Sequence, residues 1–192
     1  MATTTKTKGS PYLRQAEERR REKDEAFKYA DWSPIDPRQR GEFPGLVYFP
    51  PDERWRVQAK IRRLKDGGIF EMATSTGEPR KQLRYAKLEF QTPNGPGVLF
   101  AYKDASHSHG GGHREDRTLF VPLRDATSGK ETYGAARYLD LEEPEGDELV
   151  LDFNLAYSPY CAYSEAYSCP LPPSENWLPI RVEAGEKTFG EH

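Results

Sequence analysis

Polar residues dominate the first patterned stretch of the chain, and its apolar residues gather at the two ends. Ser10 is a favoured N-cap residue and Pro11 suits the first helical position, so a helix is expected to begin there. Good helix formers fill most of the next twenty positions. The pattern predicts a helix over residues 10–30, preceded by a disordered tail at 1–9 and followed by a proline-rich connector at 31–51.

Beyond the connector, the apolar positions recur at every second residue. Residues 55–62 and 85–90 both alternate apolar with polar side chains, which is typical of strands with one buried face. The glycine pair at 67–68 is expected to turn the chain so that residues 69–73 return as a hairpin. Asn94 and Gly95 are expected to lead into a further strand at 98–102.

The remaining strands are predicted at residues 118–123, 137–141, 149–153 and 178–182. Because turns join these segments, the sheet is expected to be largely antiparallel. About eight short strands are most economically closed as a small barrel or a sandwich, since closure removes exposed edges. The prediction is a mainly β protein with one β domain at 52–188 and a long loop at 154–177, which its aromatic residues keep ordered.

Composition narrows the classes of function. Hydrophobic residues make up 35% of the 192 and charged residues 31%, but 11 Tyr, 9 Phe and 3 Trp supply large rings for a core. A net charge of −3 argues against nucleic acid or an anionic membrane as a partner. No apolar run is long enough to span a bilayer or to act as a leader, so a soluble cytoplasmic protein is expected.

Residues 125–133 are the first candidate for chemistry. Gly129 and Lys130 resemble the end of a phosphate-binding loop, but that motif needs glycine where Arg124 stands and Ser or Thr where Glu131 stands. Nucleotide binding by that mechanism is excluded. Taken alone, the segment is better explained as a turn whose short polar side chains bond local backbone.

The end of the strand at 148–154 is the second candidate. Alternation places Asp152 and Asn154 on the face opposite Leu149, Leu151 and Phe153. Where an aromatic loop begins, two such polar residues could line a pocket. They could equally brace the loop, because buried polar groups need hydrogen-bond partners.

Three other groups of residues carry weaker signals. Cys161 and Cys169 lack the second close pair that metal sites usually show, so inert buried thiols are favoured over a nucleophile or a metal ligand, and a disulfide is least favoured. The histidines at 107, 109 and 113 lie in a glycine-rich loop, which makes them poorly preorganised ligands. Glu186 and Lys187 could act as an acid–base or anion-anchoring element, or form an ordinary surface ion pair.

Over residues 20–188 the chain resembles the domain of unknown function 1684 family. The segments that carry the resemblance are 43–50 (FPGLVYFP), 124–133 (RDATSGKETY), 137–139 (RYL), 152–154 (DFN), 159–162 (PYCA), 169–172 (CPLP) and 184–187 (AGEK), together with Ala156, Tyr157 and Asn176. The resemblance implies no activity and no cofactor. It implies a short form without the additional N-terminal region of longer members, and it marks as family-typical Asp125, Thr127, Gly129, Thr132, Tyr133, Arg137, Asp152, Asn154, Tyr157, Cys161, Cys169, Asn176, Glu186 and Lys187.

Three hypotheses remain open, and whether the protein is an enzyme is open with them. The first is a small-molecule pocket, suited to an anionic ligand, where the 125–133 turn, the 148–154 strand end and the 154–177 loop meet. Its expected catalytic residues are Asp152, Glu186 and Cys161, and its expected ligand-binding residues are Asp125, Thr127, Tyr133, Arg137, Asn154, Tyr157, Asn176 and Lys187. The second is a non-catalytic structural or interaction module in which the same residues brace the loop. The third is a metalloprotein that uses Cys161 and Cys169.

Overall fold

The computed structural model describes residues 10–105 and 117–190. The predicted N-terminal helix is present as α1 (Pro11–Tyr29), and Ser10 caps it by accepting a hydrogen bond from the Leu13 amide at 3.2 Å. The buried residues of α1 are Ala16 and Phe27. No helix in the described part of the chain is long and apolar enough to cross a membrane. The tail predicted at 1–9 lies outside the described residues.

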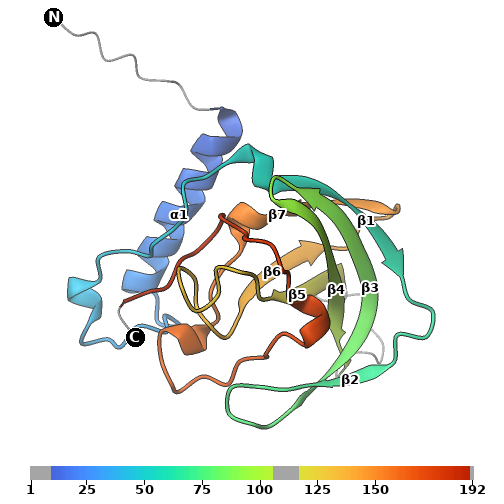
Figure 1. The fold of residues 1–192 in the computed structure, drawn as a ribbon. Helices are drawn as coiled ribbons and strands as arrows, with labels where there is room; N and C mark the ends of the chain where they lie inside the picture. The colour runs from blue at the N-terminus through green and yellow to red at the C-terminus, as the bar shows by residue number, and fades with distance from the viewer. Residues whose placement is uncertain (1–9, 106–116, 191–192) are drawn as a thin grey trace, which may run out of the picture.

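Seven strands form one antiparallel sheet that curls into a half-barrel, which confirms the mainly β prediction (Figure 1). Along the sheet the order is β6-β5-β4-β3-β1-β7, and β2 pairs with the N-terminal end of β3. The strands are β1 (Arg56–Arg63), β2 (Ile69–Met72), β3 (Arg80–Thr92), β4 (Gly95–Asp104), β5 (Thr118–Leu123), β6 (Arg137–Glu142) and β7 (Glu148–Asp152). A single bridge between Tyr138 and Tyr157 links β6 to the chain beyond β7.

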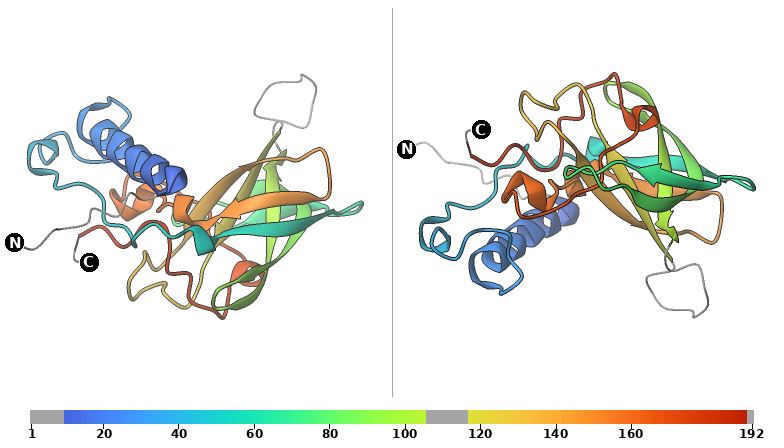
Figure 2. Two further views of the ribbon diagram at one scale, coloured as in Figure 1. Left: turned by 90° about the horizontal axis from the view of Figure 1, so that it is seen from above. Right: turned by 90° about the horizontal axis from the view of Figure 1, so that it is seen from below.

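The concave face of the sheet holds the main core. The side chains predicted to alternate inward on β1, β3 and β7 are buried there. The C-terminal segment, defined here as residues 178–187, completes this core with Leu178, Val182 and Ala184. Figure 2 shows α1 to one side of the curled sheet, with the chain that follows β7 between them. A second cluster around Phe27 joins α1 to the connector and to the long loop.

Two predicted strand arrangements are wrong. Residues 178–182 are not an eighth strand: the amide of Leu178 bonds the Arg124 carbonyl, but the amide of Val182 bonds the Asp125 carboxylate at 2.6 Å. A side chain thus replaces the main-chain acceptor that a ladder would need. The segment at 69–73 does not return as a hairpin on β1 either, because β2 pairs with β3.

The long loop and the connector are ordered by short turns and by contacts with the C-terminal segment. The long loop contains three 3₁₀ turns, at Phe153–Leu155, Tyr160–Ala162 and Ser174–Asn176. The connector pairs with the C-terminal segment through a bridge between Tyr48 and Glu186, and the Lys187 amide donates to Val47. The C-terminal segment therefore contacts the sheet, the connector and the long loop together.

Candidate functional site

Side chains of the turn at residues 125–133 form hydrogen bonds with one another in its interior. Thr127 Oγ1 lies 2.9 Å from each carboxylate oxygen of Asp125 and 3.0 Å from Thr132 Oγ1. All three side chains are buried. Asp125 and Thr127 thus shape the turn, and neither presents its polar atoms to solvent.

Arg137, at the start of β6, joins this turn to the C-terminal segment. Its side chain is 1% exposed, and its Nη2 lies 3.2 Å from Asp125 Oδ1. The same nitrogen donates to the Val182 carbonyl at 3.0 Å, and Nη1 donates to the carbonyls of Ala184 and Glu186. Burial lowers the pKa of Arg137, whereas the Asp125 charge opposes that effect. The guanidinium is therefore occupied as a structural brace.

The end of β7 binds both α1 and Asp52, the residue that follows the connector. The Tyr12 hydroxyl lies 2.8 and 2.9 Å from the two Asp152 carboxylate oxygens. Asn154 accepts from the Asp52 amide and donates to the Asp52 carbonyl, each at 2.9 Å. Burial, and then the contact with Asp152, raise the pKa of Tyr12. Asp152 and Asn154 thus hold three elements together by matched hydrogen bonds.

Glu186 lies at a third junction and is 2% exposed. One carboxylate oxygen pairs with the Lys23 ammonium of α1. The other accepts from the Ser158 amide at 2.8 Å and from the Tyr163 hydroxyl at 2.7 Å. Burial, and then the Glu186 charge, raise the pKa of Tyr163. The carboxylate therefore fixes where the Lys23 ammonium lies.

Asn176 fills a gap between two strands. β4 and β5 share one ladder pair, Tyr102 with Phe120. Beyond it the Asn176 amide accepts from the Phe100 amide at 2.7 Å and donates to the carbonyls of Phe100 and Pro122 at 2.9 and 2.7 Å. The side chain replaces ladder hydrogen bonds and leaves its amide no open donor.

Hollows of different size lie around these junctions. The aromatic cleft, of 750 Å³, runs between α1 and the long loop and is lined by Arg19, Glu22, Lys23, Ala26, Phe27, Trp32, Arg80, Tyr138, Tyr157, Pro159, Tyr160, Tyr167, Ser168, Cys169 and Pro170. The turn–loop cleft, of 730 Å³, is lined by Gly129, Lys130, Thr132, Tyr133, Gly134, Cys161, Glu165, Thr188 and Gly190. The helix pocket, of 200 Å³, is lined by Ala16, Arg19, Arg20, Lys23, Tyr48, Asn154, Leu155, Ala156, Tyr157 and Glu186.

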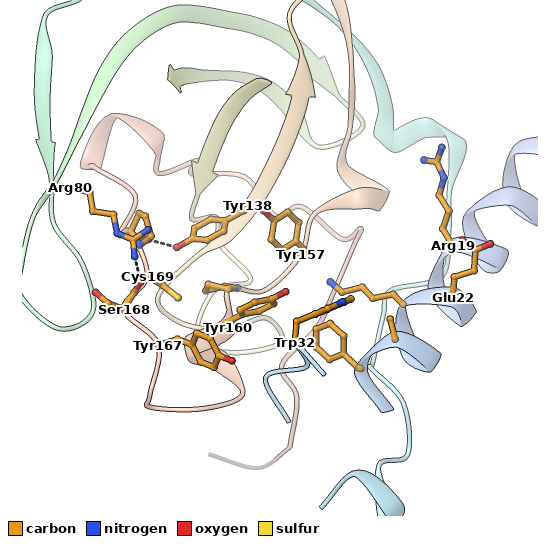
Figure 3. Close-up of a pocket in the computed structure, with 15 residues that line it drawn as sticks. Arg19, Glu22, Trp32, Arg80, Tyr138, Tyr157, Tyr160, Tyr167, Ser168 and Cys169 are labelled. Carbon is orange, nitrogen blue, oxygen red and sulfur yellow. Dashed lines mark hydrogen bonds between the residues drawn. The ribbon is translucent and has the colours of Figure 1, made fainter. Parts of the chain in front are cut away.

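Paired tyrosine rings build the aromatic cleft. Tyr138 and Tyr157 meet edge to face at 5.7 Å between centroids, and Tyr160 and Tyr167 do so at 5.1 Å. Figure 3 shows the two pairs facing the same space, with Trp32 beside Tyr160. Edge-to-face pairs hold each ring in a fixed orientation. The cleft therefore offers rigid apolar walls, suited to a flat apolar group.

Three cations and one carboxylate line the cleft with these rings. The Lys23 ammonium lies 5.0 Å from the Tyr157 ring centroid and 5.2 Å from that of Phe27. Arg80 donates to the Ser168 carbonyl at 2.8 Å at one end of the cleft, and Arg19 lies at the other end (Figure 3). Glu22 is the one carboxylate among the lining residues. The lining itself thus carries more positive than negative charge, while Glu186 outside it pairs with Lys23.

The two thiols lie on the wall between the two larger clefts. Cys161 lines the turn–loop cleft and Cys169 lines the aromatic cleft. Both are free cysteines, and the Cys161 amide donates to Cys169 Sγ at 3.3 Å. Hydrogen bonds from the Cys169 thiol and then from the Tyr133 hydroxyl lower the pKa of Cys161 to about 6.

A sequence model described as "Protein of unknown function (DUF1684)" matches residues 41–187, which include the turn, the strand end, the long loop and the C-terminal segment. The chain belongs to this family. A solution NMR structure of an uncharacterised protein of Haloarcula marismortui is similar, with 42% identity and a TM-score of 0.70, covering 94% of this chain and 96% of that one. A search of curated proteins gave no match.

In this member of the family, many of the residues that the resemblance marked as typical hold segments together. The predicted site residues do not all meet in one cavity: Asn154, Tyr157 and Glu186 share the helix pocket, whereas Tyr133 and Cys161 share the turn–loop cleft. Several predicted site residues line none of these three hollows and instead have internal partners at the junctions: Asp125, Thr127, Arg137, Asp152 and Asn176. Lys187 lies with its ammonium 5.2 Å from the Phe49 ring centroid.

No group of three or more His, Cys, Asp or Glu side chains within residues 10–105 and 117–190 could hold a metal ion. The histidine loop at 107–113 lies outside the described residues. Cys161 and Cys169 can supply two sulfur ligands, fewer than the four of a structural zinc site.

The contribution of α1 to these junctions was not predicted from the sequence. Tyr12, Arg20, Lys23 and Phe27 all face the protein, although the polar composition of the helix indicates a mostly solvated element. A signal was available: Ala16, Arg20, Lys23 and Phe27 follow the three- and four-residue spacing of one helix face. Two cations on a buried stripe indicate anionic or aromatic partners beneath the helix.

Proposed function

We propose that the protein binds a small molecule with a flat apolar body and an acidic group, and that the aromatic cleft is the binding site. The observation that carries the proposal is the combination of two edge-to-face tyrosine pairs with the cations Arg19, Lys23 and Arg80 in one 750 Å³ hollow. Ligand sites are typically mostly apolar hollows of about 300–1,000 Å³ with a few placed polar groups. An acidic group near the cations would fix the orientation of the ligand.

Binding is favoured over turnover because the expected acids and bases are already engaged. The Asp152 carboxylate accepts from Tyr12 and Asn154, and the Glu186 carboxylate from Lys23, Ser158 and Tyr163. A general base needs a free lone pair directed at the proton that it removes. In this proposal Glu186 acts through Lys23, whose ammonium it holds beside the cleft.

The test compares two probes that share one ring system. We expect 1-naphthoate to bind saturably, with one site per chain in isothermal titration calorimetry, and to shift the indole NMR signal of Trp32. The neutral analogue 1-naphthylmethanol should bind about 5- to 10-fold more weakly, because it cannot pair with the cations. Raising the salt concentration should weaken the binding of 1-naphthoate and leave the binding of the alcohol nearly unchanged.

Matched variants locate the site. Tyr160→Ala should weaken 1-naphthoate by about 10-fold or more through lost ring contact, whereas Tyr29→Ala, at a side chain that is 72% exposed, should not. Arg80→Gln should weaken naphthoate binding by about 3- to 10-fold, and Arg62→Gln on β1 should have no effect on it. Urea unfolding of each variant checks that the fold persists.

A lack of saturable binding by both probes, with folded protein, would remove this proposal. It would favour the alternative of a non-catalytic structural or interaction module. That alternative has its own support, because Asp125, Arg137, Asn154 and Asn176 hold loop and strand segments through internal hydrogen bonds.

A further inference from the structure

Two free cysteines lie on the wall that separates the aromatic cleft from the turn–loop cleft. The amide of Cys161 donates to Cys169 Sγ at 3.3 Å, which places the Cys169 sulfur against the main chain of Cys161. The residues are eight apart in sequence but belong to different turns of the long loop. Such proximity of two thiols is the arrangement from which a disulfide can form.

Cys161 is the thiol that a reagent can reach. It is partly exposed and lines the turn–loop cleft, whereas Cys169 is 7% exposed. The Tyr133 hydroxyl lies 3.8 Å from Cys161 Sγ and Lys130 lines the same cleft. Hydrogen bonds from Cys169 and then Tyr133 lower the pKa of Cys161 to about 6, and the hydrogen bond to Cys161, followed by burial, raises that of Cys169. Cys161 is thus both the more accessible thiol and the one whose pKa is lowered, which favours it as the nucleophile.

Cys169 is fixed as the second partner by its main chain. Its amide donates to Ser75 Oγ at 3.0 Å, and its carbonyl accepts from the Ser75 amide at 2.9 Å. A bridge between Thr74 and Pro170 continues this contact. The loop that precedes β3 thus holds the Cys169 sulfur beside Cys161.

We propose that Cys161 and Cys169 form a peroxide-sensitive dithiol, in which Cys161 is the attacking thiol and Cys169 the resolving one. The Cys161 thiolate attacks one oxygen of a hydroperoxide, breaks the O–O bond and becomes a sulfenic acid, while the other oxygen leaves as water or an alcohol after it takes up a proton. The Cys169 sulfur then attacks the sulfenyl sulfur, forms the S–S bond and releases water. Two electrons pass from the thiols to the peroxide, and a dithiol reductant returns them. This chemistry does not depend on ligand binding in the aromatic cleft.

The first experiment counts thiols in the full chain. Reduced protein is treated with one equivalent of hydrogen peroxide, unfolded in N-ethylmaleimide and weighed by mass spectrometry. We expect a monomer that has lost two hydrogens and takes up no maleimide. After treatment with dithiothreitol the same protein should take up two maleimides. Two maleimides without the reductant, or a covalent dimer, would overturn the proposal.

Single variants assign the two roles. Cys169→Ser should stop at the sulfenic acid, which dimedone traps on Cys161. Cys161→Ser should react with peroxide at least about 10-fold more slowly at pH 7, because the remaining thiol is buried and protonated. Equal rates for the two variants, or dimedone on Cys169 in the other variant, would refute the assignment.

Tyr133 is a positioning residue in this proposal. Tyr133→Phe should shift the pH profile of Cys161 alkylation to higher pH, since one donor to the thiolate is lost, whereas Tyr29→Phe should leave the profile in place. An unchanged profile for Tyr133→Phe would remove the tyrosine from the mechanism. Urea unfolding of both variants separates this effect from a loss of structure.

Discussion

Replacing Arg137 by methionine tests whether the buried brace holds the C-terminal segment. Methionine keeps much of the apolar length of the side chain but removes the charge and every donor. The Asp125 carboxylate, whose side chain is 0% exposed, would then lose the cation 3.2 Å away. Breaking a buried ion pair by removing one partner typically costs about 3–5 kcal/mol.

The magnitude should fall at the upper end of that range. The carbonyls of Val182, Ala184 and Glu186 also lose their donor. Each unmet buried acceptor costs about 1 kcal/mol or more, although relaxation and water entry overlap with the cost of the ion pair. We therefore expect Arg137→Met to lower the free energy of unfolding by about 4–5 kcal/mol, and Asp125→Asn to lower it by about 3 kcal/mol.

Urea unfolding followed by circular dichroism measures these values. In the double variant neither charge is left alone, so its loss should be smaller than the sum of the single losses by about 2 kcal/mol. Hydrogen exchange should speed up first at the Val182 amide, which bonds Asp125. Arg62→Met, at a side chain that is 72% exposed, is the control and should change stability by about 0.5 kcal/mol or less. A loss below about 1 kcal/mol for Arg137→Met, or strict additivity in the double variant, would contradict the reasoning.

Two further predictions concern backbone shape and pH. Gly185→Ala should lower the free energy of unfolding in urea by about 2–4 kcal/mol, because φ is +78° and a Cβ would lie 2.5 Å from the Ala156 carbonyl oxygen. The control Gly77→Ala, at φ +93° with nothing within 4 Å, should lower it by only about 1 kcal/mol. Equal losses for the two variants would contradict this prediction. Burial opposes the shift at Glu143, but hydrogen bonds, that of Lys103 foremost, lower its pKa to about 2. The folded pKa lies below the ordinary value near 4.3, so this stabilisation is present above about pH 4.5 and is lost as pH falls toward 2. Unfolding at a series of pH values should show the gap between wild type and Glu143→Gln closing over that window; a constant gap would refute it.

The strands of the half-barrel could be predicted because local alternation reports burial directly. Residues 55–61 and 86–90 place every second side chain in the core. The prediction of an eighth strand at 178–182 was wrong for a non-local reason. Nothing in the pattern at 178–182 indicates that the Asp125 carboxylate, from a distant turn, takes the Val182 amide.

The candidate site was predictable in composition but not in arrangement. Tyr157, Cys161 and Cys169 lie on cleft walls, in the loop that the sequence singled out. Whether Asp152 or Arg137 faces a cavity or a neighbour depends on which segments pack above it. α1 and the C-terminal segment provide those partners, and their approach depends on the whole fold.

The ion pair between Lys23 and Glu186 joins residues 163 positions apart, and this separation has a consequence for synthesis. A ribosome adds about 5–20 residues each second, so Glu186 is made roughly 8–30 s after Lys23. Until residue 152 is made, which takes up most of that interval, α1 has neither the Glu186 carboxylate nor the Asp152 carboxylate that binds Tyr12. The buried residues of α1 are few, Ala16 and Phe27, and the cluster around Phe27 includes Ile35 and Phe43 of the connector that follows it. The contacts of α1 with the connector can thus form early, whereas its contacts with the C-terminal half can form only after most of the residues between them have been made.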